Sequence, residues 1–146
     1  MGLNLTVMKQ TADNVFLDSN ILIYCYTTTE PDKQQKAFQV IDNNPQLFVS
    51  TQVLQEFCNV AYKKFSPQGV DLEAALSEIE SMVSIHDNNI DTVRKANAIK
   101  NKYGYSFYDS LIISAALECG CNTLYSEDMQ HSQTIENRLK IVNPFI

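Results

Sequence analysis

Four acidic residues follow apolar segments of this 146-residue chain, at positions where a folded sheet would gather ligands. Asp18 ends the first apolar run, and Glu56 lies in an apolar-striped segment after the second. Asp109 falls in the first turn of the most apolar predicted helix, and Asp128 follows a third apolar run by a short step. Open α/β sheets bind ligands beyond the carboxyl ends of their strands. We therefore treat these four carboxylates as one candidate site.

A cluster of carboxylates needs protons or a cation to persist. Two carboxylates 4 Å apart repel by about 4 kcal/mol at an effective dielectric constant near 20. Mg²⁺ and Mn²⁺ are the natural cations, because hard ions prefer oxygen ligands. Neither Cys nor His occupies the predicted strand ends, which disfavours zinc. The pattern predicts one or two Mg²⁺ or Mn²⁺ ions.

Each acid also has an ordinary structural explanation. Asp18 could be a helix N-cap, and Glu56 a solvated helix residue. Asp109 lies three residues after Ser106, as in a capping box with Asp in place of Glu. Asp128 could form an Asx turn. These alternatives stay open for single residues, but convergence of all four carboxylates would be hard to explain by them.

The elements that must position these acids alternate along the chain. Short apolar runs predict strands, and apolar positions at helical spacing predict helices. Strands are expected at 15–17, 47–49, 123–125 and 140–142, and helices at 19–26, 32–41, from Ser50 or Thr51 onward, 72–82, 91–103 and 106–117. Pro67–Gly69 and Asn43–Pro45 predict loops. The alternation predicts a mostly parallel sheet covered on both faces.

Size and composition indicate one domain spanning 1–146, with 1–13 as a ragged, polar N-terminal extension. No apolar run is long enough to span a bilayer, and no apolar signal core is present. We therefore expect a cytoplasmic protein with no membrane partner. The net charge of −6 argues against a nucleic-acid partner. Two bound divalent ions would reduce it to about −2.

The remaining metal-binding residue types do not form a zinc pattern. Only Cys119 and Cys121 are close in sequence, and the histidines, His86 and His131, lie elsewhere. We interpret the cysteines as packed cytosolic thiols and the histidines as surface or loop residues.

Four segments resemble the PIN-domain nucleases, and among them the VapC-like toxins of bacterial type II toxin–antitoxin pairs. They are VFLDSNILIY at 15–24, STQVLQEF at 50–57, YGYSFYDSLIISAALECGC at 103–121 and TLYSEDMQ at 123–130. They occur in the family's order and cover nearly all of the chain from Val15. The resemblance implies a PIN-like three-layer α/β/α domain whose mostly parallel central sheet has about four to five strands.

The resemblance also implies an activity and its residues. It implies a metal-dependent endoribonuclease, a hydrolase that leaves a 5′-phosphate and a 3′-hydroxyl. By position in the motifs, Asp18, Glu56, Asp109 and Asp128 resemble the catalytic, metal-binding quartet.

Three further residues resemble the family's supporting positions. Asn20 and Ser126 resemble polar residues that hold the acids by hydrogen bonds. The family often has Thr where this chain has Ser126, and the hydroxyl is kept. Glu127 directly precedes Asp128 and could share or take over its ligand role, so the fourth acid stays open at this point.

The implied partners are RNA, a cognate antitoxin that blocks the site, and a second copy in a homodimer. RNA could be held by basic residues outside the acidic pocket, although a solvated helix face explains any one of them better: Lys63, Lys64, Arg94, Lys95, Lys100 and Lys102. Tyr103, Tyr105 and Tyr108 could stack on unpaired bases, but core packing explains them at least as well. A housekeeping PIN nuclease of RNA processing is the main alternative. A receiver-type phosphoacceptor domain expects paired acids at the first strand and a late Lys, and a non-catalytic PIN scaffold expects lost acids. This chain matches neither expectation.

Overall fold

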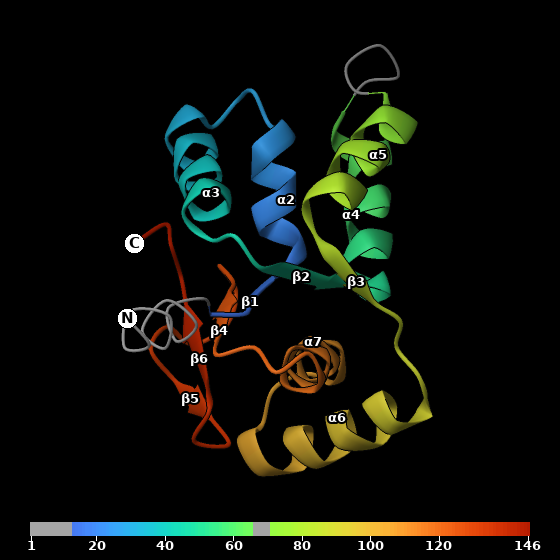
Figure 1. The fold of residues 1–146 in the computed structure, drawn as a ribbon, viewed down its shortest axis with the longest axis vertical. Helices are drawn as coiled ribbons and strands as arrows, with labels where there is room; N and C mark the ends of the chain where they lie inside the picture. Colours follow the sequence, from blue (N-terminus) through green and yellow to red (C-terminus); the bar gives the residue numbers. More distant parts are fainter. Residues whose placement is uncertain (1–12, 66–70) are drawn as a thin grey trace, which may run out of the picture.

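The computed structural model describes residues 13–65 and 71–146, which form a sheet between two groups of helices (Figure 1). The described strands are β1 (Val15–Leu17), β2 (Leu47–Ser50), β3 (Ser84–His86), β4 (Thr123–Tyr125), β5 (Thr134–Ile135) and β6 (Leu139–Val142). Their order is β3-β2-β1-β4-β6-β5, and every pairing is parallel except that of β5 with β6. The predicted α/β fold with a mostly parallel sheet is confirmed.

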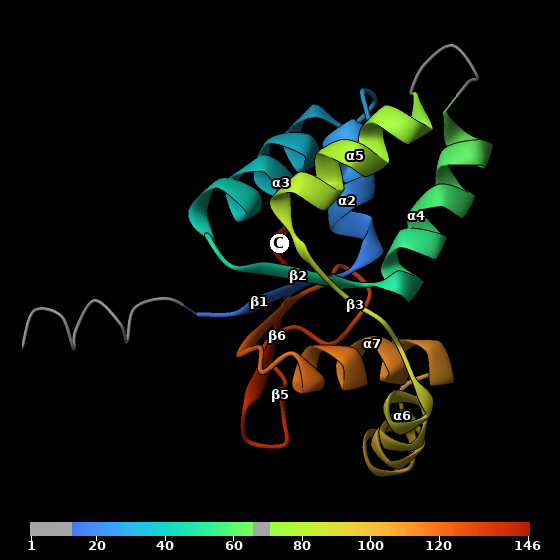
Figure 2. The ribbon, with the colours of Figure 1, turned by 45° about the vertical axis from the view of Figure 1, so that its right-hand side comes forward.

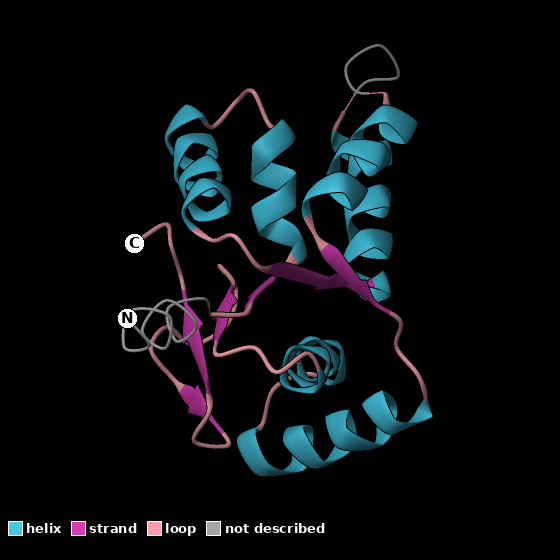
Figure 3. Cartoon of the chain, in the orientation of Figure 1, coloured by secondary structure: helices cyan, strands magenta, loops and turns pink. Residues whose placement is uncertain are grey.

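Helices cover both faces of this sheet (Figures 2 and 3). One face carries α2 (Ser19–Tyr26), α3 (Pro31–Asn43), α4 (Thr51–Lys64) and α5 (Leu72–Met82), and the other carries α6 (Ile90–Tyr103) and α7 (Phe107–Glu118). Where the sequence predicted a helix end, the observed end lies within two residues of it. The predicted loop at Pro67–Gly69 and most of the predicted extension at 1–13 lie outside the described residues.

The register of the central strands brings two predicted site residues, Asp18 and Ser126, to one edge of the sheet. Phe16 lies opposite both Phe48 and Leu124, and Leu17 lies opposite Tyr125. Because these strands are parallel, the residues that follow them emerge at the same edge. Asp18 and Ser126 therefore come directly after paired residues of β1 and β4.

Helix α7 is buried over eight consecutive residues. Every residue from Ser110 to Leu117 is buried, which fits a helix enclosed by the sheet on one side and α6 on the other. Gly104 ends the preceding helix with φ at 81°, a conformation that glycine adopts without strain. Asp109 lies just before these buried residues, in the first turn of α7. The helix therefore fixes its backbone, while its side chain stays partly exposed.

Two strands were not predicted, so the described part of the chain has six strands where about four to five were expected. β3 lies at one edge and has two exposed side chains out of three, and β5 is only two residues long. Neither segment has, in its sequence, the apolar run or the alternation of apolar and polar residues on which a strand prediction depends. No helix in the described ranges is both long and apolar enough to cross a membrane.

Candidate active site

Asp18 is the most deeply buried of the four predicted acids, with 4% of its surface exposed. It caps α2, and its Oδ1 accepts a hydrogen bond of 2.7 Å from the Ser19 backbone N–H. Its Oδ2 accepts a second bond of 2.7 Å from the Ser126 hydroxyl. The N-cap explanation is therefore correct, and it is compatible with a place in the site.

Burial raises the pKa of Asp18 to about 7, because the charged form loses hydration inside the protein. The hydrogen bonds from Ser126 and Ser19 lower the pKa, whereas the nearby charges of Glu56 and Asp128 raise it further. Near neutral pH this carboxyl group is therefore close to the midpoint of its ionisation, and keeping it charged has an energetic cost. A cation beside it would remove that cost.

Glu56 is held by residues of two helices. The Ser19 hydroxyl donates to its Oε2 at 2.9 Å, and Gln52 Nε2 donates to its Oε1 at 2.9 Å. The same Gln52 nitrogen lies 3.1 Å from the Tyr108 carbonyl oxygen. Glu56 is therefore not a freely solvated helix residue, and Gln52 joins α4 to the first turn of α7.

Asp109 is half-buried at the start of α7, and the Ser106 hydroxyl accepts its backbone N–H at 3.1 Å. Burial raises the pKa of its carboxyl, the bond to Ser106 lowers it, and the charges of Asp128 and Glu56 raise it again. The net direction is upward. Asp109 therefore shares an electrostatic environment with the other acids.

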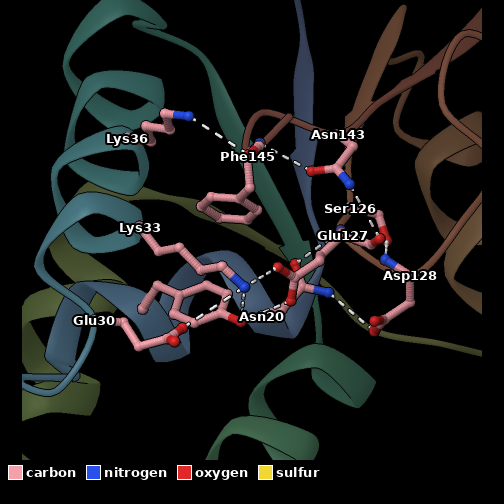
Figure 4. A network of polar contacts seen from close by, with 10 residues as sticks. Asn20, Glu30, Lys33, Lys36, Ser126, Glu127, Asp128, Asn143 and Phe145 are labelled. Carbon is pink, nitrogen blue, oxygen red and sulfur yellow. Dashed lines mark hydrogen bonds and ion pairs between the residues drawn. The ribbon is translucent and has the colours of Figure 1, made fainter.

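Asp128 is held by Asn20, the second residue of α2 (Figure 4). Asn20 Nδ2 donates to Asp128 Oδ2 at 3.1 Å, and Asn20 Oδ1 accepts the Glu127 backbone N–H at 3.3 Å. The Asp128 backbone N–H lies 3.3 Å from the Ser126 hydroxyl oxygen. Asn20 thus contacts Asp128, and Ser126 contacts both Asp18 and Asp128.

Glu127 points to other partners. Its two carboxylate oxygens accept bonds of 2.7 Å from the Tyr24 hydroxyl and from Lys33 Nζ. Burial raises the pKa of Glu127, but the bonds from Lys33 and Tyr24 outweigh this and the pKa lies below its usual value. Asn143 Nδ2 also donates to the Glu127 carbonyl at 3.3 Å (Figure 4). The Glu127 carboxylate therefore pairs with the cation of Lys33 in α3, whereas the Asp128 carboxylate accepts from the neutral amide of Asn20.

The charge balance at the quartet is acidic. Within the described ranges, each ion pair formed by a Lys or His involves some other acid: Glu30, Glu127, Glu118 or Glu136. In those ranges, no three His, Cys, Asp or Glu side chains form a ready-made metal cage. The donors nevertheless suit Mg²⁺ or Mn²⁺, because all are carboxylate oxygens and the ion pairs of the described ranges leave buried Asp18 without a cation.

Both histidines, which the sequence indicates as surface or loop residues, and Lys102, a candidate for RNA binding, have partners other than the four acids. His86 contacts Glu118 at 3.1 Å, and His131 Nδ1 accepts the Asn143 backbone N–H at 2.9 Å. Lys102 pairs with Glu136 at 2.6 Å on the surface. The histidines therefore have structural partners of their own.

Sequence reasoning missed two residues that touch the site, Ser19 and Gln52. Gln52 lies four residues before Glu56 and so on the same helix face, which was a usable signal. Ser19 follows Asp18 directly, but its contact with Glu56 depends on how α2 meets α4. Only the tertiary structure reveals that contact.

Comparison with solved structures places the fold beside known toxins. A toxin–antitoxin complex from Klebsiella pneumoniae contains a chain with a TM-score of 0.69 and 20% identity, over 90% of this chain and 98% of that one. Mycobacterium tuberculosis VapC20, described as a toxin that cleaves the sarcin–ricin loop, gives 0.68 and 15% over 86% and 99%. VapBC2 from Rickettsia felis, bound to a DNA fragment from its promoter, gives 0.63 and 20% over 87% and 96%. These likenesses show a shared fold.

Comparison with curated proteins gives no match. Comparison with protein families matches the PIN domain over residues 15–136. This range spans β1 through β5 and includes all four acids of the quartet. The chain belongs to the PIN domain family.

Proposed function

We propose that this protein is a metal-dependent endoribonuclease and the toxin of a toxin–antitoxin pair. One observation carries the proposal: Asp18 is buried at the end of the central strand, beside Glu56 and Asp128, with its pKa raised to about 7. An ion pair does not explain why an acid is buried here, because the nearby charges of Glu56 and Asp128 are negative and raise the pKa of Asp18 further. A site built to hold a divalent cation does explain it.

The proposed metal ligands are Asp18, Glu56, Asp109 and Asp128. PIN nucleases generally use divalent ions, and these side chains supply the oxygen donors that Mg²⁺ and Mn²⁺ prefer. When bound, one or two such ions would lower the pKa of a coordinated water and offset charge on the scissile phosphate.

The protein's own contribution is to fix the carboxylates. The hydrogen bonds from Ser19 and Ser126 orient both oxygens of Asp18 and favour its charged form. Gln52 and the Ser19 hydroxyl hold Glu56, and Asn20 holds Asp128. Such supporting bonds set ligand orientation in metal sites.

A toxin role is supported by the structural neighbours, because two of them come from toxin–antitoxin complexes. We propose RNA as the substrate and a cognate antitoxin as the partner. We also propose that the toxin is a homodimer of this chain. A housekeeping nuclease with the same chemistry would cut RNA without arresting growth when it is produced alone. Induction in bacteria, with growth and RNA integrity measured together, therefore separates the two roles.

The direct test is cleavage of total RNA by the purified protein in Mg²⁺ or Mn²⁺. We expect discrete cuts that EDTA abolishes, and a loss of at least about 100-fold in Asp18→Asn, because one metal ligand is lost. Asp87→Asn, which removes an exposed acid after β3, is the matched control and should cut normally. Cleavage that persists in EDTA or in Asp18→Asn would contradict the metal mechanism.

Ser126→Ala should weaken activation by the metal about 10-fold to 100-fold, because Asp18 Oδ2 loses its hydroxyl donor. Ser126→Thr retains that hydroxyl and should stay within a few-fold of the wild type. The measurement is the Mn²⁺ concentration that gives half-maximal cleavage. Equal values for the Ala and Thr variants would show that the hydroxyl does not support the site.

A further inference from the structure

A shallow, open pocket of about 290 Å³ lies beside Glu56, between α4 and the start of α7. Its lining differs in chemistry from the four acids: apart from Glu56, it consists of three side-chain amides and one aromatic ring. The lining residues are Gln52, Gln55, Glu56, Asn59 and Tyr108. The contacts described above do not use Gln55, Asn59 or the Tyr108 ring.

Tyr108 is an exposed aromatic held in a defined place. Its side chain is 67% exposed, although it lies next to Asp109. Its carbonyl is tied to Gln52 of α4 at 3.1 Å, and its ring meets the Phe107 ring edge-on, with centroids 5.8 Å apart and planes at 73°. The backbone and one neighbour of the ring are therefore fixed while much of the ring stays open to solvent.

The amides share one face of α4. Gln52, Gln55 and Asn59 follow helical spacing, so their side chains point to the same side. Gln52 is only 6% exposed and its amide nitrogen is occupied by Glu56 and Tyr108, so it serves as a brace. Gln55 and Asn59 are exposed, and each amide offers both a donor and an acceptor.

This combination selects among ligand chemistries. A phosphate would need a cation, and the pocket lining contains none while including the Glu56 carboxylate. A neutral, flat group with donors and acceptors along its edge fits better. Unpaired nucleobases have this chemistry, and proteins bind them by stacking on aromatic rings and by hydrogen bonds to their edges.

We propose that Tyr108, Gln55 and Asn59 form a nucleobase subsite that holds an unpaired base next to the cleaved phosphodiester. The proposal rests on the proposed function, because it assigns a role to RNA beside the acid quartet. Tyr108 supplies the stacking face, and the two amides read the edge of the base. Because the subsite adjoins Glu56, the base it holds fixes which bond reaches the acids.

Binding can be measured without cleavage, in EDTA, using short single-stranded RNAs that carry 2-aminopurine at one position. Stacking on Tyr108 should quench the fluorescence of this base, and Tyr108→Ala should weaken binding roughly 10-fold. Tyr108→Phe keeps the ring and should bind within about twofold of the wild type. Phe38→Ala and Gln39→Ala, exposed positions on α3, are the matched controls for the ring and the amides.

Cleavage then gives an independent readout. In Mg²⁺ or Mn²⁺, Gln55→Ala and Asn59→Ala should change which base is preferred beside the cut, while Gln39→Ala should not. If Tyr108→Ala binds like the wild type and the cut sites do not change in any variant, the subsite is overturned while the nuclease stands. If the wild type binds these RNAs and shows the Tyr108 effect but cuts no RNA, the subsite stands and the proposed function fails. No binding and no cutting by the wild type would overturn both.

Discussion

Asp18→Asn is expected to stabilise the metal-free protein while abolishing cleavage. The folded protein raises the pKa of Asp18 from an ordinary 3.8 to about 7, chiefly by burial. At about pH 8 the wild type must keep a buried charge, a cost of up to about 4 kcal/mol. The amide of Asn has no such cost and can still accept from Ser19, while Ser126 can turn its hydroxyl to accept. We expect the free energy of unfolding to rise by about 2–4 kcal/mol.

The pH dependence tests the cause of this gain. Between about pH 4 and pH 7 the folded state binds the Asp18 proton more tightly than the unfolded state, so wild-type stability falls as the pH rises through this window. Below it both states are protonated and this contribution is constant, and above it the full cost remains. Asp18→Asn lacks this contribution, so its advantage over the wild type should be small near pH 4 and largest near pH 8.

Urea unfolding in EDTA at several pH values measures both quantities, with Asp87→Asn as the control. Asp109 also has a raised pKa and Glu127 a lowered one, so only the difference between proteins at one pH isolates Asp18. Added Mg²⁺ or Mn²⁺ should stabilise the wild type more than the variant, because the ion binds only the folded state. A variant that is less stable than the wild type at every pH would refute the account of Asp18 as a costly buried charge.

The sequence predicted the strands that carry an apolar run and missed the two short strands at the edges of the sheet. β1 lies at the centre of the sheet and is buried at every position, and for this reason all three of its residues are apolar. β3 and β5 lie at the two edges of the sheet, where backbone pairing holds the strand and the side chains carry little signal. Edge strands of this kind require the tertiary structure.

The candidate site shows the same division. The acids could be found because each lies at a fixed offset from a strand or a helix start, as Asp18 does after β1. The contacts between helices could not: Gln52 meets the Tyr108 carbonyl across 56 positions of sequence, at a distance set by how α4 and α7 pack. The sequence assigned Asp128 to the quartet but left open whether Glu127 shares or takes over its role, since neighbouring acids differ only in which way the backbone turns them.

Asp128→Asn and Glu127→Gln are expected to have very different effects on cleavage. Asp128 adds to the charge around Asp18 and Asp109, so Asp128→Asn should reduce cleavage at least about 100-fold, as for loss of a metal ligand. The Glu127 carboxylate is instead neutralised by Lys33 and Tyr24, and its bond to Asn20 comes from the backbone. Glu127→Gln should therefore change cleavage by less than about 10-fold.

Stability separates the two acids in the opposite direction. Glu127→Gln removes an acceptor for Lys33 and should lower the free energy of unfolding, whereas Asp128→Asn removes repulsion and should not. Single-turnover cleavage and urea unfolding on the same preparations give both values, with Asp87→Asn as the reference. If Glu127→Gln loses cleavage as severely as Asp128→Asn while remaining as stable as the wild type, Glu127 must reach the metal, and the contact with Lys33 cannot persist when RNA is bound. If Asp128→Asn cuts normally, the fourth acid has been wrongly assigned. The contacts of Asp128 with Asn20 and Ser126 do not need a charge, so metal binding is the one proposed role that the substitution tests.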